Sequence, residues 1–120
     1  VTGFSFLGHL HEMMGGRLSC VVDARAVPVL PGAWEAADAC LYTAAGQRNR
    51  NHTGPFVRFE NVPFPMEEIL FDPQTSGGLL LAVAPQEAEA LAQELRAAGL
   101  PAAIVGELSK ANDPEITVTY

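Results

Sequence analysis

The sequence has 120 residues, and its 14 acidic residues against seven Lys and Arg give a formal net charge of −7. With 48% hydrophobic residues it can bury the core of a single domain spanning residues 1–120, which argues against disorder. The negative charge argues against binding to nucleic-acid backbones or anionic lipid, because both need a basic face. No apolar run approaches the ~20 residues of a membrane span, and no signal peptide is visible, which predicts a cytoplasmic protein.

The first third of the sequence predicts a helix, a strand and a second short helix. Apolar residues recur at helical spacing over residues 6–14, with Thr2 as the expected N-cap and Gly15 as the expected end. The apolar run 18–22 predicts a strand, and residues 34–41 place apolar side chains on one face of a short helix.

The middle of the sequence, residues 42–65, is broken by glycines and prolines and predicts mostly irregular structure. Alternation over residues 57–60 favours one short strand there. Residues 66–71 predict one or two helical turns, which end before Pro73. No repeat or low-complexity tract interrupts the chain.

The last third predicts a strand, a helix and two further strands. The continuous apolar run 79–83 is typical of a strand that is covered on both faces. Pro85 opens a helix whose apolar stripe lies within residues 88–95. Residues 102–105 resume as a strand, and alternation over 116–120 indicates an edge strand or a one-sided strand. The whole pattern predicts one α+β domain built in layers.

Three segments have the composition of a binding site for an anion. Residues 1–4 form a Thr-Gly turn before a helix, where free N–H groups and the helix dipole favour negative charge. Residues 72–78 combine two hydroxyls with two glycines, which let a backbone approach a ligand closely. Arg48, within residues 46–51, can make a bidentate contact with phosphate. Each segment also has a purely structural interpretation, as a helix cap, a packed turn and a solvated basic loop respectively.

Other reactive residue types do not assemble into a site. His9 and His11 are two residues apart on the predicted helix and point about 200° away from each other, so they are poor joint metal ligands. Cys20 and Cys40 lack the CxxC spacing and are expected to be free thiols. The chain therefore carries no self-sufficient active site.

Taken together, the three segments resemble the selenophosphate synthetase (selenide, water dikinase) family. Residues 1–10 are similar to its DVTGFGLLGHL pattern, residues 46–49 to its GGxxRN, and residues 72–80 to its DPQTSGGLL. The motifs occur in the family's order, and the resemblance runs nearly the whole length of the chain. By this resemblance, the residues close to ATP and its phosphates are Thr2, Gly3, Arg48, Asn49, Asp72, Gln74, Thr75, Ser76, Gly77 and Gly78.

The resemblance implies a C-terminal domain with a layered α/β/α fold and a mixed sheet, partly ferredoxin-like. The family makes selenophosphate from ATP, selenide and water, releases AMP and phosphate, and needs Mg²⁺ and often K⁺. Its reactive Cys or selenocysteine and most of its metal-binding Asp residues belong to an N-terminal domain absent from this chain, and one further Asp would immediately precede Val1. We therefore expect one wall of an ATP site, with no catalytic residue, no metal ligand and no activity of the chain alone. The full-length enzyme is expected to be a homodimer.

Two departures from the family pattern and two alternatives stay open. Ser5 replaces the second Gly of TGFG, which crowds a close backbone approach. Residues 44–46 read Ala-Ala-Gly where the family more often has Pro-Gly-Gly. The first alternative is another ATP-dependent member of the same superfamily, resembling thiamine monophosphate kinase or a hydrogenase maturation factor. The second is a binding module without chemistry.

Overall fold

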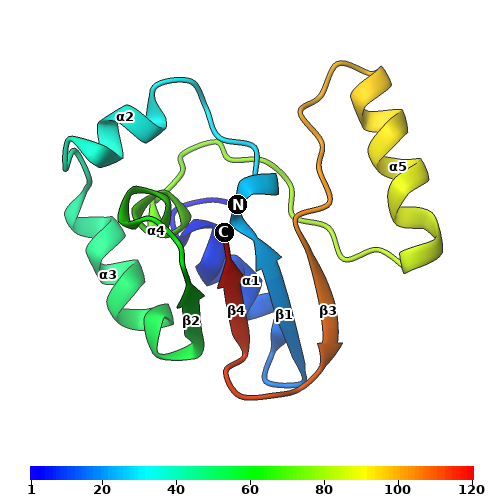
Figure 1. The fold of residues 1–120 in the computed structure, drawn as a ribbon, viewed down its shortest axis with the longest axis horizontal. Helices are drawn as coiled ribbons and strands as arrows, with labels where there is room; N and C mark the ends of the chain where they lie inside the picture. The colour runs from blue at the N-terminus through cyan, green and yellow to red at the C-terminus, as the bar shows by residue number, and fades with distance from the viewer.

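The structure is a computed structural model that describes residues 1–120. Five α-helices and four strands are interspersed along the chain (Figure 1). The helices are α1 (Ser5–Met14), α2 (Ala33–Asp38), α3 (Ala44–Thr53), α4 (Phe64–Phe71) and α5 (Pro85–Ala97), with 3₁₀ helices η1 (Ala24–Ala26) and η2 (Gly54–Phe56). The strands are β1 (Leu18–Asp23), β2 (Val57–Glu60), β3 (Gly106–Lys110) and β4 (Ile116–Thr119).

The four strands form one mixed sheet in the order β2-β4-β1-β3. β4 runs parallel to both β1 and β2, whereas β3 is antiparallel to β1. This confirms the predicted α+β class and the mixed sheet. Of the two alternatives predicted for residues 116–120, the edge strand was wrong, because β4 lies between β1 and β2. The one-sided strand agrees with a sheet that helices cover on one face, although Thr117, which is paired with Val21 and Arg58 of the other face, is also buried.

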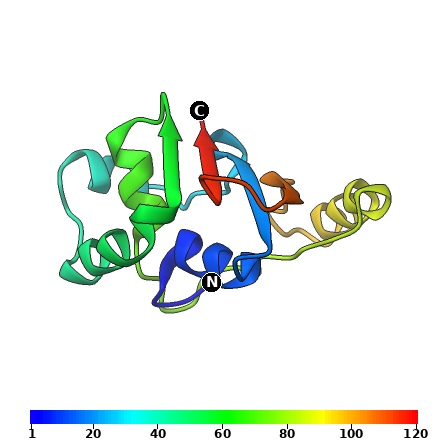
Figure 2. The ribbon, with the colours of Figure 1, turned by 90° about the horizontal axis from the view of Figure 1, so that it is seen from below.

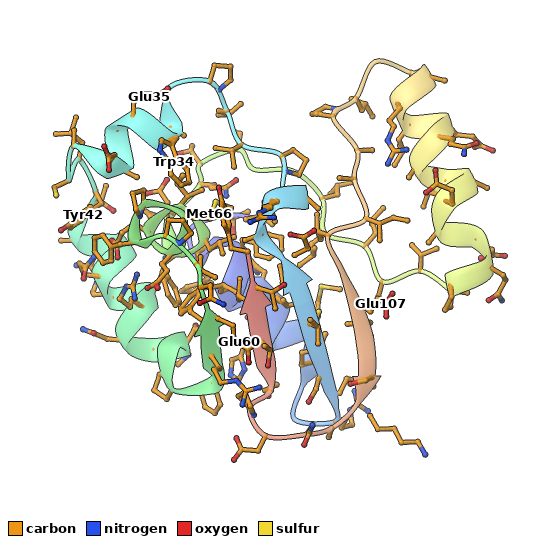
Figure 3. All side chains as sticks on the ribbon, viewed as in Figure 1. Trp34, Glu35, Tyr42, Glu60, Met66 and Glu107 are labelled. Carbon is orange, nitrogen blue, oxygen red and sulfur yellow. The ribbon has the colours of Figure 1, made fainter.

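The hydrophobic core lies between one face of the sheet and the helices. Figure 2 shows α1 below the strands, with α3 and α4 to one side, and Figure 3 shows Met66 of α4 near the centre of the molecule. The opposite face of the sheet is open, since Val21 is 50% exposed and the Arg58 side chain 57%. The core residues are Phe6, Leu7, Leu10, Met14, Cys20, Val22, Ala24, Met66, Leu70, Phe71, Ile116 and Val118.

Most of the element boundaries predicted before residue 79 are close to those observed. Gly15 ends α1 with the left-handed φ of 55° that glycine favours. β1 and β2 lie where residues 18–22 and 57–60 predicted them. The start of α1 differs, because the helix begins at Ser5 and the Thr2 hydroxyl does not cap it.

The prediction of mostly irregular structure over residues 42–65 was wrong, because α3 lies there. The Thr43 hydroxyl starts this helix by accepting a hydrogen bond from the Gly46 N–H at 3.0 Å. The buried face of α3 consists of Gly46, Asn49 and Thr53. These residues have helical spacing but form no apolar stripe, which is the signal on which the prediction depended.

Residues 79–105 form an arm, and we call the remainder of the chain the body. Figures 1 and 2 show α5 standing apart from the body. The strands predicted at residues 79–83 and 102–105 do not form, and β3 begins only at Gly106. Both sides of β1 are already occupied by β4 and β3, so the sheet offers the apolar run at 79–83 no place beside its inner strands.

The helix of the arm forms as predicted but remains uncovered. α5 buries only Ala92 of its apolar stripe. Its C-terminal glycine, Gly99, has the expected positive φ of 82°. None of the helices is both long and apolar enough to cross a membrane.

Candidate functional site

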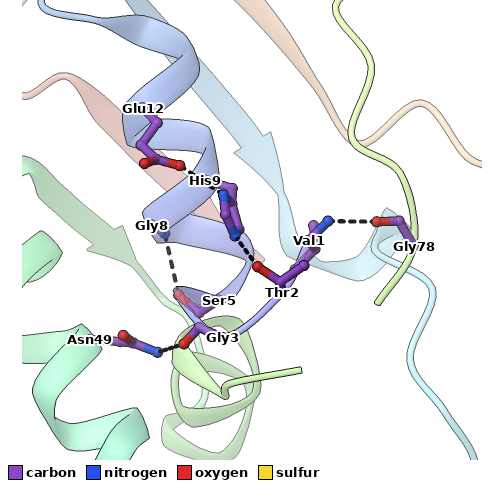
Figure 4. Close-up of polar contacts among 9 residues, drawn as sticks. All are labelled: Val1, Thr2, Gly3, Ser5, Gly8, His9, Glu12, Asn49 and Gly78. Carbon is purple, nitrogen blue, oxygen red and sulfur yellow. Dashed lines mark hydrogen bonds and ion pairs between the residues drawn. The ribbon is translucent and has the colours of Figure 1, made fainter. Parts of the chain in front are cut away.

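The three candidate segments meet at one edge of the body, although they lie far apart in the sequence. The N–H of Gln74 donates to the carbonyl oxygen of Thr2 at 3.1 Å. The nitrogen of Val1 donates to the carbonyl oxygen of Gly78 at 2.7 Å, and the side chain of Asn49 donates to that of Gly3 at 3.0 Å (Figure 4). The site therefore joins the segment before α1, the helix α3 and the turn after α4.

Asn49 is the brace between these segments. Its Nδ2 donates to the carbonyl oxygen of Gly3 and, at 3.1 Å, to that of Phe71, the last residue of α4. The side chain is 9% exposed, and both of its N–H donors are used. Its amide nitrogen thus supports the shape of the site and has no donor left for a ligand.

Two turns at this edge expose backbone N–H groups that have no acceptor within the protein. Gly3 and Phe4 donate no hydrogen bond, and neither do the four residues of 75–78. Thr75, Ser76 and both residues of the Thr2-Gly3 turn are exposed. Clustered free N–H groups of this kind favour an anionic ligand.

The two adjacent glycines of the second turn differ in their surroundings. A Cβ added to Gly77 would collide with the carbonyl oxygen of Val1 and with Oε1 of Gln74. A Cβ added to Gly78 would meet nothing within 4 Å. The close contact between the first and third segments therefore depends on Gly77, while Gly78 already faces open space.

Ser5 occupies a backbone conformation that suits glycine. Its φ is 72°, in the left-handed region, which costs a residue with a Cβ about 1–2 kcal/mol. Its Oγ accepts a hydrogen bond from the N–H of Gly8 at 3.2 Å, and so performs the capping role predicted for Thr2. The Ser5 side chain is fully buried and belongs to the start of α1.

The two arginines of α3 have different surroundings. Arg50 pairs with Glu67 at 2.9 Å and with the buried Glu68 at 2.7 Å, and its guanidinium carbon lies 4.8 Å from the centre of the Phe71 ring. Although this second contact is short, its angles are poor for a hydrogen bond. Arg48 is exposed and makes no ion pair or side-chain hydrogen bond, so it is the cation of this helix that a ligand can reach.

The acidic residue that begins the second turn is partly buried. Burial raises the pKa of the Asp72 carboxyl above its ordinary value. No three His, Cys, Asp or Glu side chains in the chain lie close enough together to hold a metal ion.

One feature of this edge was missed from the sequence, where His9 was considered only as a metal ligand. Nε2 of His9 lies 2.9 Å from Oγ1 of Thr2, and its Nδ1 lies 2.8 Å from Oε2 of Glu12 (Figure 4). The three-residue spacing of His9 and Glu12 on a helix was the available signal, because it places two side chains side by side. A shallow depression next to them is lined by Val1, His9, Glu12, Met13, Leu79 and Leu80.

Comparison with known proteins agrees with the resemblance seen in the motifs. The chain is 57% identical over 119 residues to a selenide, water dikinase of Agathobacter rectalis, a match that covers 98% of this chain and 35% of the relative. Proteins of the same name from Desulfitobacterium hafniense and Treponema denticola are 44% and 40% identical, with 90% and 99% of this chain and 32% and 35% of the relatives covered. The chain thus spans about a third of the length of these relatives.

The family described as "AIR synthase related protein, C-terminal domain" matches residues 1–119. The match includes the body, the arm and all three segments of the site. The chain therefore belongs to the AIR synthase related protein C-terminal domain family.

Proposed function

We propose that this chain is the C-terminal domain of a selenide, water dikinase and forms one wall of its ATP site. The observation that carries the proposal is the convergence of residues 1–4, 46–51 and 72–78 at one exposed edge with unpaired N–H groups. The names of the relatives support the same reaction, the formation of selenophosphate from ATP, selenide and water with release of AMP and phosphate.

In this proposal the residues of the edge bind and orient phosphates. Phosphoryl transfer depends mainly on positioning and on charge stabilisation. The N–H groups of Gly3, Phe4 and residues 75–78 would face the phosphate oxygens, and the guanidinium of Arg48 would add a charge-assisted contact. Asn49 would hold the segment before α1 and the turn after α4 in fixed positions relative to each other.

The remaining parts of the reaction are assigned to sequence outside this chain. The nucleophile and the ligands of Mg²⁺ and K⁺ would come from the part of the enzyme that the relatives have in addition. Mg²⁺ would neutralise phosphate charge when bound there. The full-length enzyme is proposed to be a cytoplasmic homodimer.

A graft provides the direct test of activity. The C-terminal third of the Agathobacter rectalis relative is replaced by residues 1–119 of this chain, and selenide-dependent release of AMP from ATP is measured. We expect the graft to be active and the chain alone to be inactive. A folded, inactive graft, or robust turnover by the chain alone, would contradict the proposal.

Binding can be tested on the chain itself by following backbone amide signals in NMR during titration with ATP–Mg²⁺. The amides of Gly3, Phe4 and residues 75–78 should shift, and those of the open sheet face should not. Replacing Arg48 by Met should weaken binding roughly tenfold, since a hydrogen bond to a charged group is worth about 1.5–3 kcal/mol. The matched control, Arg58→Met on the open face, should leave the affinity unchanged.

A further inference from the structure

Thr2, His9 and Glu12 form a hydrogen-bonded relay at the edge of the proposed phosphate site. Oγ1 of Thr2 lies 2.9 Å from Nε2 of His9, whose Nδ1 lies 2.8 Å from the Glu12 carboxylate. Figure 4 shows the three side chains in line beside the Val1–Gly78 contact. The imidazole is 25% exposed and Glu12 is 63% exposed, so the ring is the sheltered member of the relay.

The carboxylate determines which nitrogen of the neutral ring carries the proton. An ionised carboxylate can only accept, so Nδ1 of His9 must donate to Glu12. Nε2 is then an acceptor, and the hydroxyl of Thr2 must donate its single proton to it. In this state Thr2 presents only lone pairs to the exposed turn, which suits water or a cation and does not suit a phosphate oxygen.

Protonation of the ring reverses the direction of this hydrogen bond. Nε2 of the imidazolium donates to Oγ1 of Thr2, so the hydroxyl proton is free to point toward an anion. The imidazolium also brings one positive charge to the edge. An anion at Thr2 must therefore bind the protonated form of the relay more tightly than the neutral form.

We propose that the relay couples anion binding to proton uptake: His9 takes a proton from solvent when a tetrahedral oxyanion of the phosphate class binds beside Thr2. His9 is thus a positioning residue that acts through the Thr2 hydroxyl. The proposal rests on the phosphate site of the proposed function. By linkage, binding of the proton and binding of the anion strengthen each other by the same factor.

The surroundings of His9 limit which other groups can take up the proton. The charged group that contacts the ring is Glu12 on the same helix. The other neighbours are apolar: the Phe4 ring, with its centroid 6.0 Å away, and the depression-lining residues Met13, Leu79 and Leu80. Proton uptake is therefore assigned to the ring.

The test is an NMR pH titration of the imidazole signals with and without sulfate at constant ionic strength. Sulfate has the shape and charge of the phosphate dianion but does not titrate near neutral pH. The chain has three histidines, so His11 and His52 are internal controls. We expect saturating sulfate to raise the midpoint of His9 alone, by about one pH unit for each tenfold preference for the protonated ring.

Variants distinguish the hydrogen-bonded relay from a purely electrostatic effect of sulfate on His9. Thr2→Val removes the hydroxyl at nearly constant shape and should reduce the sulfate-induced shift to the part that the charge of the ring alone causes, while Thr2→Ser should retain the full shift. Glu12→Gln should retain part of the shift, because the amide oxygen can still accept from Nδ1 but the amide NH₂ can also donate to it. A His9 midpoint that sulfate does not move, or a shift that persists unchanged in Thr2→Val, would overturn the relay.

The amide signals distinguish this failure from failure of the proposed function. If sulfate shifts the amides of residues 75–78 but not the midpoint of His9, the anion site stands and the relay is refuted. If sulfate and ATP–Mg²⁺ both leave those amides unmoved, the anion site and the relay fall together.

Discussion

Apolar residues make up a larger share of the arm than of the body, but the body buries its apolar core and the arm leaves most of its apolar residues exposed. Leu7 of α1 is completely buried, whereas Leu79 at the start of the arm is 88% exposed. Leu81 and Leu100, which lie before and after α5, are each 53% exposed. An apolar run thus records that a segment favours burial, but it does not identify the surface that buries it.

The arm also shows that a helix and a strand depend on their surroundings in different ways. α5 forms inside the arm because a helix satisfies its backbone hydrogen bonds internally. A strand needs a neighbouring strand for its N–H and C=O groups. The flanks of the arm share only one backbone bond with a strand, from the Asp23 N–H to the Val105 carbonyl oxygen at 2.9 Å, while the Ala102 carbonyl oxygen accepts from Arg96 within the arm. The predicted helix of the arm is therefore present, while the two predicted strands are not.

The sharpest test of this comparison is one substitution made in both regions. Leu7→Ala should lower the free energy of unfolding by about 2–5 kcal/mol, because it leaves a cavity in a packed core. Leu79→Ala should change it by less than about 0.5 kcal/mol. Urea unfolding of both variants provides the measurement. Similar losses would mean that the arm is packed in solution.

The fold of the body followed from apolar periodicity wherever a stripe was present. α1 and α2 were predicted from such stripes, and β1 from a short apolar run. α3 was missed because its buried positions are Gly46, Asn49 and Thr53. The motif residues of the site were found individually, but their convergence depends on α3 and on the path of the chain after α4, and no local pattern encodes either of them.

Asn49 tests whether the site belongs to the body. Asn49→Ala leaves the carbonyl oxygens of Gly3 and Phe71 without their partner, which should cost about 1–3 kcal/mol. Asn51→Ala, at an exposed position of the same helix, is the matched control and should be nearly neutral. Thermal or urea unfolding measures both. Equal effects would show that the brace contributes nothing to stability.

The contact between the first and third segments of the site depends on a single glycine. Gly77→Ala forces a Cβ against the carbonyl oxygen of Val1 and should cost about 1–3 kcal/mol through overpacking. Gly78→Ala meets no atom within 4 Å and should change stability by less than about 0.5 kcal/mol. If the two variants unfold alike, the contact between the first and third segments is absent in solution.

The last expected effect is confined to alkaline pH and concerns the strand that returns the arm to the body. Cys20 of β1 is paired with Leu108 of β3, and burial raises the pKa of the Cys20 thiol from 9.0 to about 11. The folded chain keeps this proton where the unfolded chain has lost it, so the free energy of unfolding should fall as pH rises from about 9 to about 11. Cys20→Ala should remove that slope.

The reactivity of the two thiols measures how well the folded chain protects Cys20, without unfolding the chain. At pH 8 the exposed Cys40 should react with a thiol reagent much faster than Cys20, because reaction requires the thiolate and access to solvent. β3 is the edge strand that covers Cys20 on one side, and it is also the strand to which the unsupported arm is attached. Equal rates for the two thiols would show that β3 detaches together with the arm, which would move the boundary of the body from Gly106 back to β1.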